Sequence, residues 1–355
     1  MSSPLPPGER FIRAMPKVEL HVHLEGAIQP ATLLELARRH RVALPADSVE
    51  GLRAWYRFTD FPHFVEVYLL ISSCLRTLED IELIAREFLA GQAAQNIRHS
   101  EVTYTAYTHY HFRGFSFRDQ LGALERARLW AEQEHGVSAG WVIDIPRPIS
   151  GPEGLMVAEW ALAGRDQGVV ALGLAGPEVG SPPERYRAAF DRAFDAGLPR
   201  VPHAGETVGP ESIWGALRAL RADRIGHGVR CLEDPELVEH LRAAQIPLEV
   251  CPTSNVCLGV VPTLADHPLP RLIEHGLYVT LNSDDPPMFN TSLTDEYLAA
   301  AHTFGLDADA LERLSLNALR ASLLSPDVKQ RLETEFRADF ARLRAEHLSD
   351  DPSQR

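Results

Sequence analysis

The segment PKVELHVHLEGAI, residues 16–28, indicates the fold of this chain more directly than any other. Its centre, VELHVHL (18–24), alternates aliphatic with polar side chains, as a strand does. Side chains two residues apart on a strand point to the same face, so His21 and His23 share one face and the aliphatic residues share the other. We expect the two imidazoles to face the interior of a barrel and the aliphatic side chains to pack against helices.

Strand candidates alternate with helical segments along most of the chain. They lie at 18–24, 99–105, 138–145, 169–175, 198–204, 224–230, 246–252 and 277–283. This alternation predicts a parallel (β/α)8 TIM barrel, which commonly uses a chain of this length as one domain. An open doubly wound sheet is the alternative fold, but no glycine-rich phosphate or dinucleotide loop follows the first strand.

Three parts of the chain lie outside the regular alternation. The segment 25–98 is too long for one connection between a strand and a helix, so we expect extra helices inserted after the first strand, over the C-terminal mouth of the barrel. The other two parts are the ends, about 1–10 and 346–355, which we expect to be flexible. The whole chain, 1–355, is expected to form a single domain.

The composition narrows the class of protein. With 355 residues, 45% of them hydrophobic and 24% charged, the chain has the balance of a globular protein. Its net charge of −14 argues against a nucleic-acid partner, and the lack of a basic block or a long apolar run argues against a membrane partner. We expect a cytoplasmic protein, because no apolar signal-peptide core is present and the 4 cysteines are scattered. The oligomeric state is not indicated.

Polar residues able to do chemistry gather at the ends of the expected strands. They are His21, His23, His203, Glu206, His227, Asp284 and Asp285. In a (β/α)8 barrel the C-terminal ends of the strands meet at one face, where active sites lie. A set of three histidines and one aspartate suits zinc, and the set here would be His21, His23, His203 and Asp284. Glu206 is then a candidate for proton transfer, and His227 a candidate for orienting hydroxide or stabilising developing charge.

Spacing alone does not define this site, because His109 and His111 repeat it. That second pair lies in a Tyr-rich stretch that reads as a loop, and we expect no metal there. The chain has two lysines, Lys17 and Lys329, and neither lies in a middle strand where a modified lysine would bridge two metals. We therefore expect one zinc ion per chain. The cysteines also lack the PCxxC pattern of the cytidine-deaminase zinc site.

Five segments together resemble the adenosine deaminase family of the amidohydrolase superfamily. They are PKVELHVHLEGAI, LAGPE (174–178), HAGE (203–206), RIGHG (224–228) and NSDDPPMF (282–289). The resemblance extends from about residue 15 to 325. It implies zinc-dependent hydrolysis of the 6-amino group of a purine, with release of ammonia and a small-molecule purine nucleoside as the binding partner.

The same resemblance implies roles for individual residues. The zinc ligands would be His21, His23, His203 and Asp284. Glu206 would protonate the purine ring, and His227 would position the attacking hydroxide. Asp285 and the backbone N–H of Gly176 would contact the purine.

The substrate is less strongly indicated. Glu25 stands where typical adenosine deaminases have Asp, and we expect it to face the 5′ side of the ribose. Gly176 and Gly226 resemble nucleoside-specific rather than adenine-specific members. The segment FTDFPHFVEVY (58–68) resembles members that deaminate 6-aminodeoxyfutalosine, a 5′-extended adenosine, in the menaquinone pathway. Adenosine and 6-aminodeoxyfutalosine remain near-equal substrates, with free adenine or a catalytically inactive purine-binding protein as alternatives.

Overall fold

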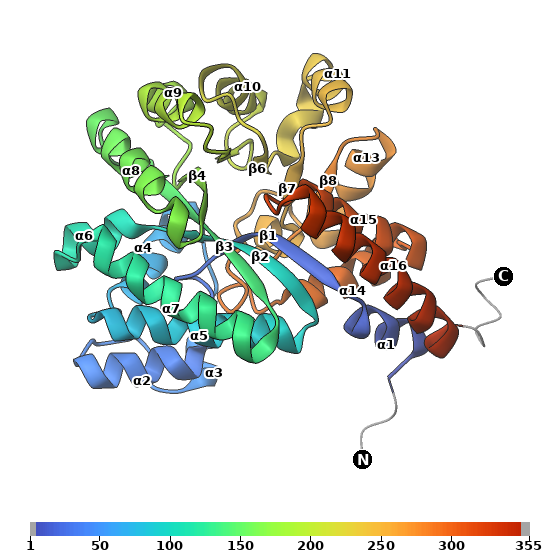
Figure 1. Cartoon of the computed structure of the whole chain (residues 1–355), viewed down its shortest axis with the longest axis horizontal. Helices are drawn as coiled ribbons and strands as arrows, with labels where there is room; N and C mark the ends of the chain where they lie inside the picture. The colour runs from blue at the N-terminus through green and yellow to red at the C-terminus, as the bar shows by residue number, and fades with distance from the viewer. Residues whose placement is uncertain (1–4, 349–355) are drawn as a thin grey trace.

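Eight parallel strands follow one another around the sheet in chain order in the computed structural model, which describes residues 5–348 (Figure 1). They are β1 (Lys17–His23), β2 (Ile97–Tyr104), β3 (Ser138–Pro146), β4 (Val169–Ala175), β5 (Arg200–Ala204), β6 (Ile225–His227), β7 (Leu248–Val250) and β8 (Val279–Leu281). A parallel bridge between Val22 and Asp284 joins the last strand region to the first. The fold is therefore a nearly closed (β/α)8 barrel, as the alternation of strands and helices predicted.

Helices surround the barrel on all sides in Figure 1. They are α1 (Pro7–Ala14), α2 (Pro30–His40), α3 (Val49–Trp55), α4 (Phe61–Ser72), α5 (Leu78–Ala94), α6 (Ala106–Arg113), α7 (Phe117–His135), α8 (Gly151–Ala163), α9 (Arg187–Asp195), α10 (Pro210–Ala219), α11 (Pro235–Ala244), α12 (Pro252–Cys257), α13 (Leu269–Glu274), α14 (Leu293–Phe304), α15 (Ala308–Ala321) and α16 (Pro326–His347). Within residues 5–348, no helix is long and apolar enough to cross a membrane.

The long segment after β1 forms the helices α2 to α5, as expected. Side chains at the starts of these helices define their boundaries: Ser48 caps α3 and Asp60 caps α4. Thr77 and Asp80 form a reciprocal capping box at the start of α5. The helix α4 then brings Phe61, Phe64 and Tyr68 to the wall of a cavity at the mouth of the barrel.

The aliphatic side chains of β1 are buried against the helices, as predicted from their alternation. Val18 and Leu20 belong to one hydrophobic core cluster, together with residues of α15 and α16. Val22 and Leu24 belong to a second cluster, together with residues of α2, α4 and α5. The first strand is thus fully buried on both faces, which fixes the direction of its two histidines.

The last strands are shorter than the sequence predicted. The run 224–230 is a strand only from Ile225 to His227, because His227 and Gly228 both take a positive φ that ends the extended backbone. The run 277–283 shortens to Val279–Leu281, and Asp284 just beyond it also has a positive φ, +65°. Both turns lie at the carboxyl end of a strand, where the site is found.

One further expectation was wrong. The stretch around His109 and His111 is not a loop but the helix α6, which buries Tyr107 and His109. Near the ends, α1 includes residues 7–10 and α16 continues to His347, while the flexibility of the ends stays a prediction. Phe11 of α1 packs in the same core cluster as residues of α16, which explains why both helices form. Residues 1–4 and 349–355 lie outside the described part of the chain.

Candidate active site

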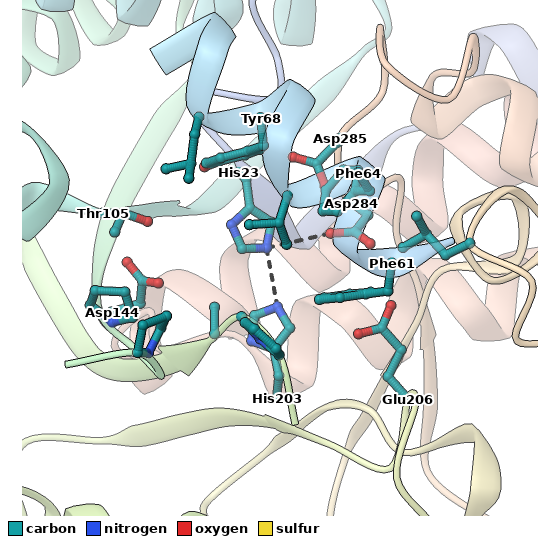
Figure 2. A pocket seen from close by; sticks show the side chains of 18 of the residues that line it. His23, Phe61, Phe64, Tyr68, Thr105, Asp144, His203, Glu206, Asp284 and Asp285 are labelled. Atoms are coloured by element: carbon teal, nitrogen blue, oxygen red, sulfur yellow. Dashed lines mark hydrogen bonds and ion pairs between the residues drawn. The ribbon is translucent and has the colours of Figure 1, made fainter. Parts of the chain in front are cut away.

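Four side chains with metal-binding atoms meet where the barrel closes. They are His21, His23, His203 and Asp284, all buried, and their ligand atoms lie within 4.8 Å of one another. Nε2 of His23 lies 3.1 Å from Nε2 of His203, and Oδ1 of Asp284 lies 3.4 Å from Nε2 of both His21 and His23. Figure 2 shows His23 and His203 pointing toward each other beside Asp284.

The backbone that closes the barrel positions these residues. The N–H of His23 donates to the carbonyl of Asp284, and the N–H of Asp284 donates to the carbonyl of His21. The Asn282 side-chain oxygen accepts from the N–H groups of Leu20 and His21, which fixes the two chain segments against each other. The positive φ of Asp284 is an uncommon conformation for a residue other than glycine, and such strain is concentrated at functional sites.

The cluster has the charge and the unpaired atom expected of a metal site. Nε2 of His21 is buried without a hydrogen-bond partner, a deficit that a bound cation would remove. Burial lowers the pKa of His23 to about 4, so this imidazole is neutral at pH 7 and able to donate a lone pair. Burial would raise the pKa of Asp284, but contacts with His21 and His227 hold it well below its usual range.

A second layer of carboxylates orients the histidines. Oε2 of Glu249 lies 2.9 Å from Nδ1 of His21, and Arg224 bridges Glu249 to Glu101 with two contacts of 2.6 Å. Burial alone would lower the pKa of His21, but its contacts with Asp284 and Glu249 raise it to about 10. The two carboxylates around His21 therefore favour a positive charge at this place, on the imidazole or on a cation beside it. A carboxylate behind a histidine is the usual partner of a metal-binding imidazole.

Glu206 and His227 lie beside the metal-binding group. Oε2 of Glu206 is 3.7 Å from Nε2 of His227, and both side chains are buried. Burial, followed by Asp284 and Glu178, raises the pKa of Glu206 well above its ordinary value. Burial lowers the pKa of His227 to about 4. A carboxyl group that holds a proton beside a neutral imidazole suits proton transfer near pH 7.

Glu178 holds the loop that carries Glu206. Its carboxylate accepts hydrogen bonds from the backbone N–H groups of Gly205, Glu206, Thr207 and Val208. Four backbone donors converging on one carboxylate make this loop rigid. The sequence reasoning quoted Glu178 in LAGPE but gave it no role. Its place just after the fourth strand was the signal that could have identified it.

Glycines make room for the site at two places. A Cβ atom on Gly226 would lie 2.8 Å from Cε1 of His21, so only glycine fits beside that ring. A Cβ atom on Gly26 would lie 1.7 Å from Oδ1 of Asp285. Oδ1 of Asp285 is buried without a hydrogen-bond partner and Asp285 lines the cavity, so it is free to bind a ligand atom.

The space beside this cluster, open solvent included, is about 780 Å³. Its residues include His23, His203, Glu206, His227, Asp284, Asp285 and Gly176. Gly176 has a φ of +97°, a conformation that favours glycine. Phe61, Phe64 and Leu69 of α4 give the opposite wall an apolar surface. A cavity with apolar walls and a few polar groups is typical of small-molecule sites.

Glu25 lies behind the cavity wall and is not one of the lining residues described for the cavity. Its Oε2 accepts from the Tyr68 hydroxyl at 3.1 Å, and its Oε1 accepts from the N–H of Thr105 at 3.2 Å. Nε2 of His109 lies 3.1 Å from the same Oε1. Glu25 thereby positions Tyr68 and Thr105, which do line the cavity, and its contact with a ribose stays a prediction.

The second His pair takes no part in a metal site among the described residues. His109 pairs with Glu25 instead, and the absence of a metal there stays a prediction. One other group, His227, Cys251 and Asp284, has ligand atoms close enough to hold a metal. Burial raises the pKa of the Cys251 thiol well above its usual value, which keeps it protonated and a poor ligand. The set around His203 is therefore the candidate metal centre.

Asp144 and Tyr68 also line the cavity and were not identified from the sequence. Asp144 is a carboxylate near the end of an otherwise apolar strand, and that position was the available signal. Tyr68 belongs to α4, so its direction depends on how an inserted helix packs over the barrel. A sequence pattern does not contain that information.

A parallel barrel that carries a buried three-histidine, one-aspartate cluster, with a buried glutamate beside a cavity, defines a hydrolase of the amidohydrolase type. The family model for adenosine deaminase matches residues 16–338, and this chain belongs to that family. Aminodeoxyfutalosine deaminase of Streptomyces avermitilis is 44% identical over 92% of this chain and 91% of its own length. The family predicted from the sequence motifs is confirmed.

Solved structures agree with this assignment. The structure of adenine deaminase from Arthrobacter aurescens is 36% identical and covers 92% of this chain and 99% of its own, with a TM-score of 0.87. An amidohydrolase structure from Burkholderia ambifaria with bound zinc is 25% identical and covers 98% of this chain and 97% of its own, with a TM-score of 0.91. The protein is an enzyme, a hydrolytic deaminase acting on C–N bonds.

Proposed function

We propose that this protein is a zinc-dependent deaminase of an adenine nucleoside, with 6-aminodeoxyfutalosine as its substrate in menaquinone biosynthesis. The reaction adds water at C6 of the purine and releases the 6-amino group as ammonia, leaving the 6-oxo purine. The observation that carries the chemistry is the convergence of four metal-binding side chains with Glu206 at one end of the cavity. The similarity over nine-tenths of the chain to an aminodeoxyfutalosine deaminase supports the substrate.

The residues present fit one zinc ion. His21, His23, His203 and Asp284 would hold it, because three nitrogen donors and one oxygen donor match its preferred ligands. A bound zinc ion supplies a nucleophile at neutral pH, because it lowers the pKa of a water ligand to about 7. The described lysines support a single ion: Lys17 donates to the carbonyls of Met15 and Gln95, far from any ligand role.

The chain's own groups then bind the purine and move protons. Glu206 delivers its proton to the ring nitrogen next to C6 as the new C–O bond forms, and the attacking water returns a proton to the Glu206 carboxylate. His227 lies 3.7 Å from Glu206 and orients the attacking oxygen. Asp285 and the N–H of Gly176 hold the purine ring in the cavity. The apolar side chains of α4 exclude water from the reacting groups.

A comparison of substrates tests this proposal. The wild-type enzyme should convert 6-aminodeoxyfutalosine and adenosine with an ultraviolet shift toward the 6-oxo purine and stoichiometric ammonia, with the larger kcat/KM for 6-aminodeoxyfutalosine. Turnover of neither nucleoside by zinc-loaded protein would contradict it and would favour a catalytically inactive purine-binding protein.

Adenine deaminase is the second candidate. The likeness to the adenine deaminase of Arthrobacter aurescens, with a TM-score of 0.87, favours it. A kcat/KM for free adenine above that for both nucleosides would establish this alternative.

A further inference from the structure

Asp144, near the end of β3, lines the cavity but has no part in the chemistry described above. Its exposed fraction is 1%, and its Oδ1 is buried without a hydrogen-bond partner. A buried acceptor without a donor costs free energy, so the few such groups in a native structure need an explanation. Because Asp144 lies in a cavity wall, a bound ligand can supply the missing donor.

The neighbouring strand makes space for this carboxylate. Asp144 pairs in register with Gly173 of β4, and a Cβ atom on Gly173 would lie 3.1 Å from Cβ of Asp144. A larger residue at 173 would therefore crowd Asp144 against the cavity wall. The rest of β3 is apolar, glycine or serine, and every residue from Ala139 to Ile145 is buried. Core packing alone does not call for a carboxylate in such a strand.

Asp144 lies away from the reacting groups. Figure 2 shows it beside Thr105, on the opposite side of His23 and His203 from Glu206. A purine whose C6 faces Glu206 carries its N9 substituent on the other side of the ring system. The group nearest to Asp144 in a bound nucleoside is therefore part of the sugar.

The charge of the cavity wall around Asp144 indicates which kind of hydrogen-bond donor a ligand would offer to this carboxylate. Within residues 5–348, no residue that lines the cavity is Lys or Arg. No cationic side chain of the described lining residues therefore compensates Asp144, and burial, followed by the nearby Glu25, raises the pKa of Asp144 to about 7. A carboxylate without a cationic partner accepts a hydrogen bond from a neutral hydroxyl group.

We propose that Asp144 accepts a hydrogen bond from a ribose hydroxyl of the substrate and thereby selects ribonucleosides over deoxyribonucleosides. This inference rests on the proposed function, because it presumes that the cavity binds an adenine nucleoside. It assigns a specificity role to a residue on the wall opposite the proton-transfer group.

The contact between Asp144 and a ribose hydroxyl group can be tested by varying the protein and the substrate together. The enzymes are wild type, Asp144→Ala and Asp144→Asn, with Asp166→Asn as an exposed control on the other side of the β3–β4 unit. The substrates are adenosine, 2′-deoxyadenosine, 3′-deoxyadenosine and adenosine monophosphate, and 6-aminodeoxyfutalosine is measured alongside. Metal content and the melting temperature of each variant report whether the site and the fold remain intact.

The expected result is a loss that depends on the hydroxyl group. Wild type should lose about ten- to hundredfold in kcat/KM when one of the two hydroxyls is removed, as for one hydrogen bond to a charged acceptor. Asp144→Ala should show a similar loss on adenosine, mainly through KM, and no further loss on the deoxynucleoside. Asp144→Asn, which keeps a weaker acceptor, should fall between the two, and Asp166→Asn should match wild type. The monophosphate, which keeps both ribose hydroxyl groups, should lose activity in Asp144→Ala by about the same factor as adenosine.

Two other outcomes would distinguish a failure of this inference from a failure of the proposed function. Asp144 variants that keep the wild-type preference for ribose over both deoxyriboses would overturn this inference and leave the proposed function intact. A wild-type enzyme without activity on any of the nucleosides would instead contradict the proposed function. If Asp144→Ala does not fold, Asp144→Asn gives the same comparison with a smaller expected change.

Discussion

The two ends of the cavity are built in different ways. At the metal end, His21, His203 and Asp284 come from strands or from turns that directly follow them, and backbone hydrogen bonds link those strands. At the other end, Tyr68 comes from the inserted helix α4 and Glu25 holds it from behind the wall. The strands of this barrel therefore provide the catalytic residues, whereas the inserted helices determine which substrates the cavity admits.

Of the changes at the two ends of the cavity, removing a metal ligand should lower kcat/KM the most. His203→Ala takes away one of four donors, so the protein should lose its metal and about 10⁴-fold or more in kcat/KM. Metal analysis and the deamination rate check both results. The exposed His240→Ala is the matched control and should change neither. Full activity in metal-free His203→Ala would disprove the assigned metal set.

Removing the proton-transfer group should have the next largest effect. Glu206→Gln should lower kcat by about 10²- to 10⁴-fold while the metal stays bound, because Glu206 is not a ligand. The exposed Glu239→Gln serves as the control. Unchanged turnover in Glu206→Gln would mean that another group moves the proton.

Replacing Glu249, the carboxylate behind His21, should have a smaller effect than either of these two substitutions. Glu249→Gln keeps the shape of the side chain but weakens its 2.9 Å contact with Nδ1 of His21. We expect about ten- to hundredfold weaker metal binding, measured by competition with a chelator. Equal metal affinity in the variant and wild type would show that Glu249 does not support the ligand.

A change at the other end of the cavity should be smaller and different in kind. Tyr68→Phe removes the donor to Glu25, which should cost about 1–2 kcal/mol of unfolding free energy. It should raise KM for the nucleoside severalfold and leave metal content and kcat near wild type. Tyr110→Phe, an exposed tyrosine of α6, is the control. A loss of metal in Tyr68→Phe would contradict the separation of the two ends.

The sequence predicted the metal end better than the substrate end. The barrel followed from the alternation of strands and helices, and the ligand set followed from polar residues at strand ends. The short strands β6 and β8 were not predictable, because residues such as His227 and Asp284 take positive φ for the geometry of the site rather than from local preference.

The substrate end depends on packing between segments far apart in the chain. The helix α6 was read as a loop because its Tyr- and His-rich sequence has weak helix preference, although tertiary contacts stabilise it. Glu25 accepts a hydrogen bond from Tyr68 of α4, a contact between distant segments that the sequence pattern did not indicate. Asp144 depends on the space left by Gly173 of the neighbouring strand, which a single-strand pattern does not reveal.

We expect His21, His23, His203 and Asp284 to hold one zinc ion next to Glu206. Anomalous diffraction from crystals of the purified protein, recorded on both sides of the zinc absorption edge, would locate this ion. A single peak per chain is expected, bounded by the three imidazoles and the Asp284 carboxylate. No peak at that position in zinc-supplemented crystals, or two peaks there, would contradict it.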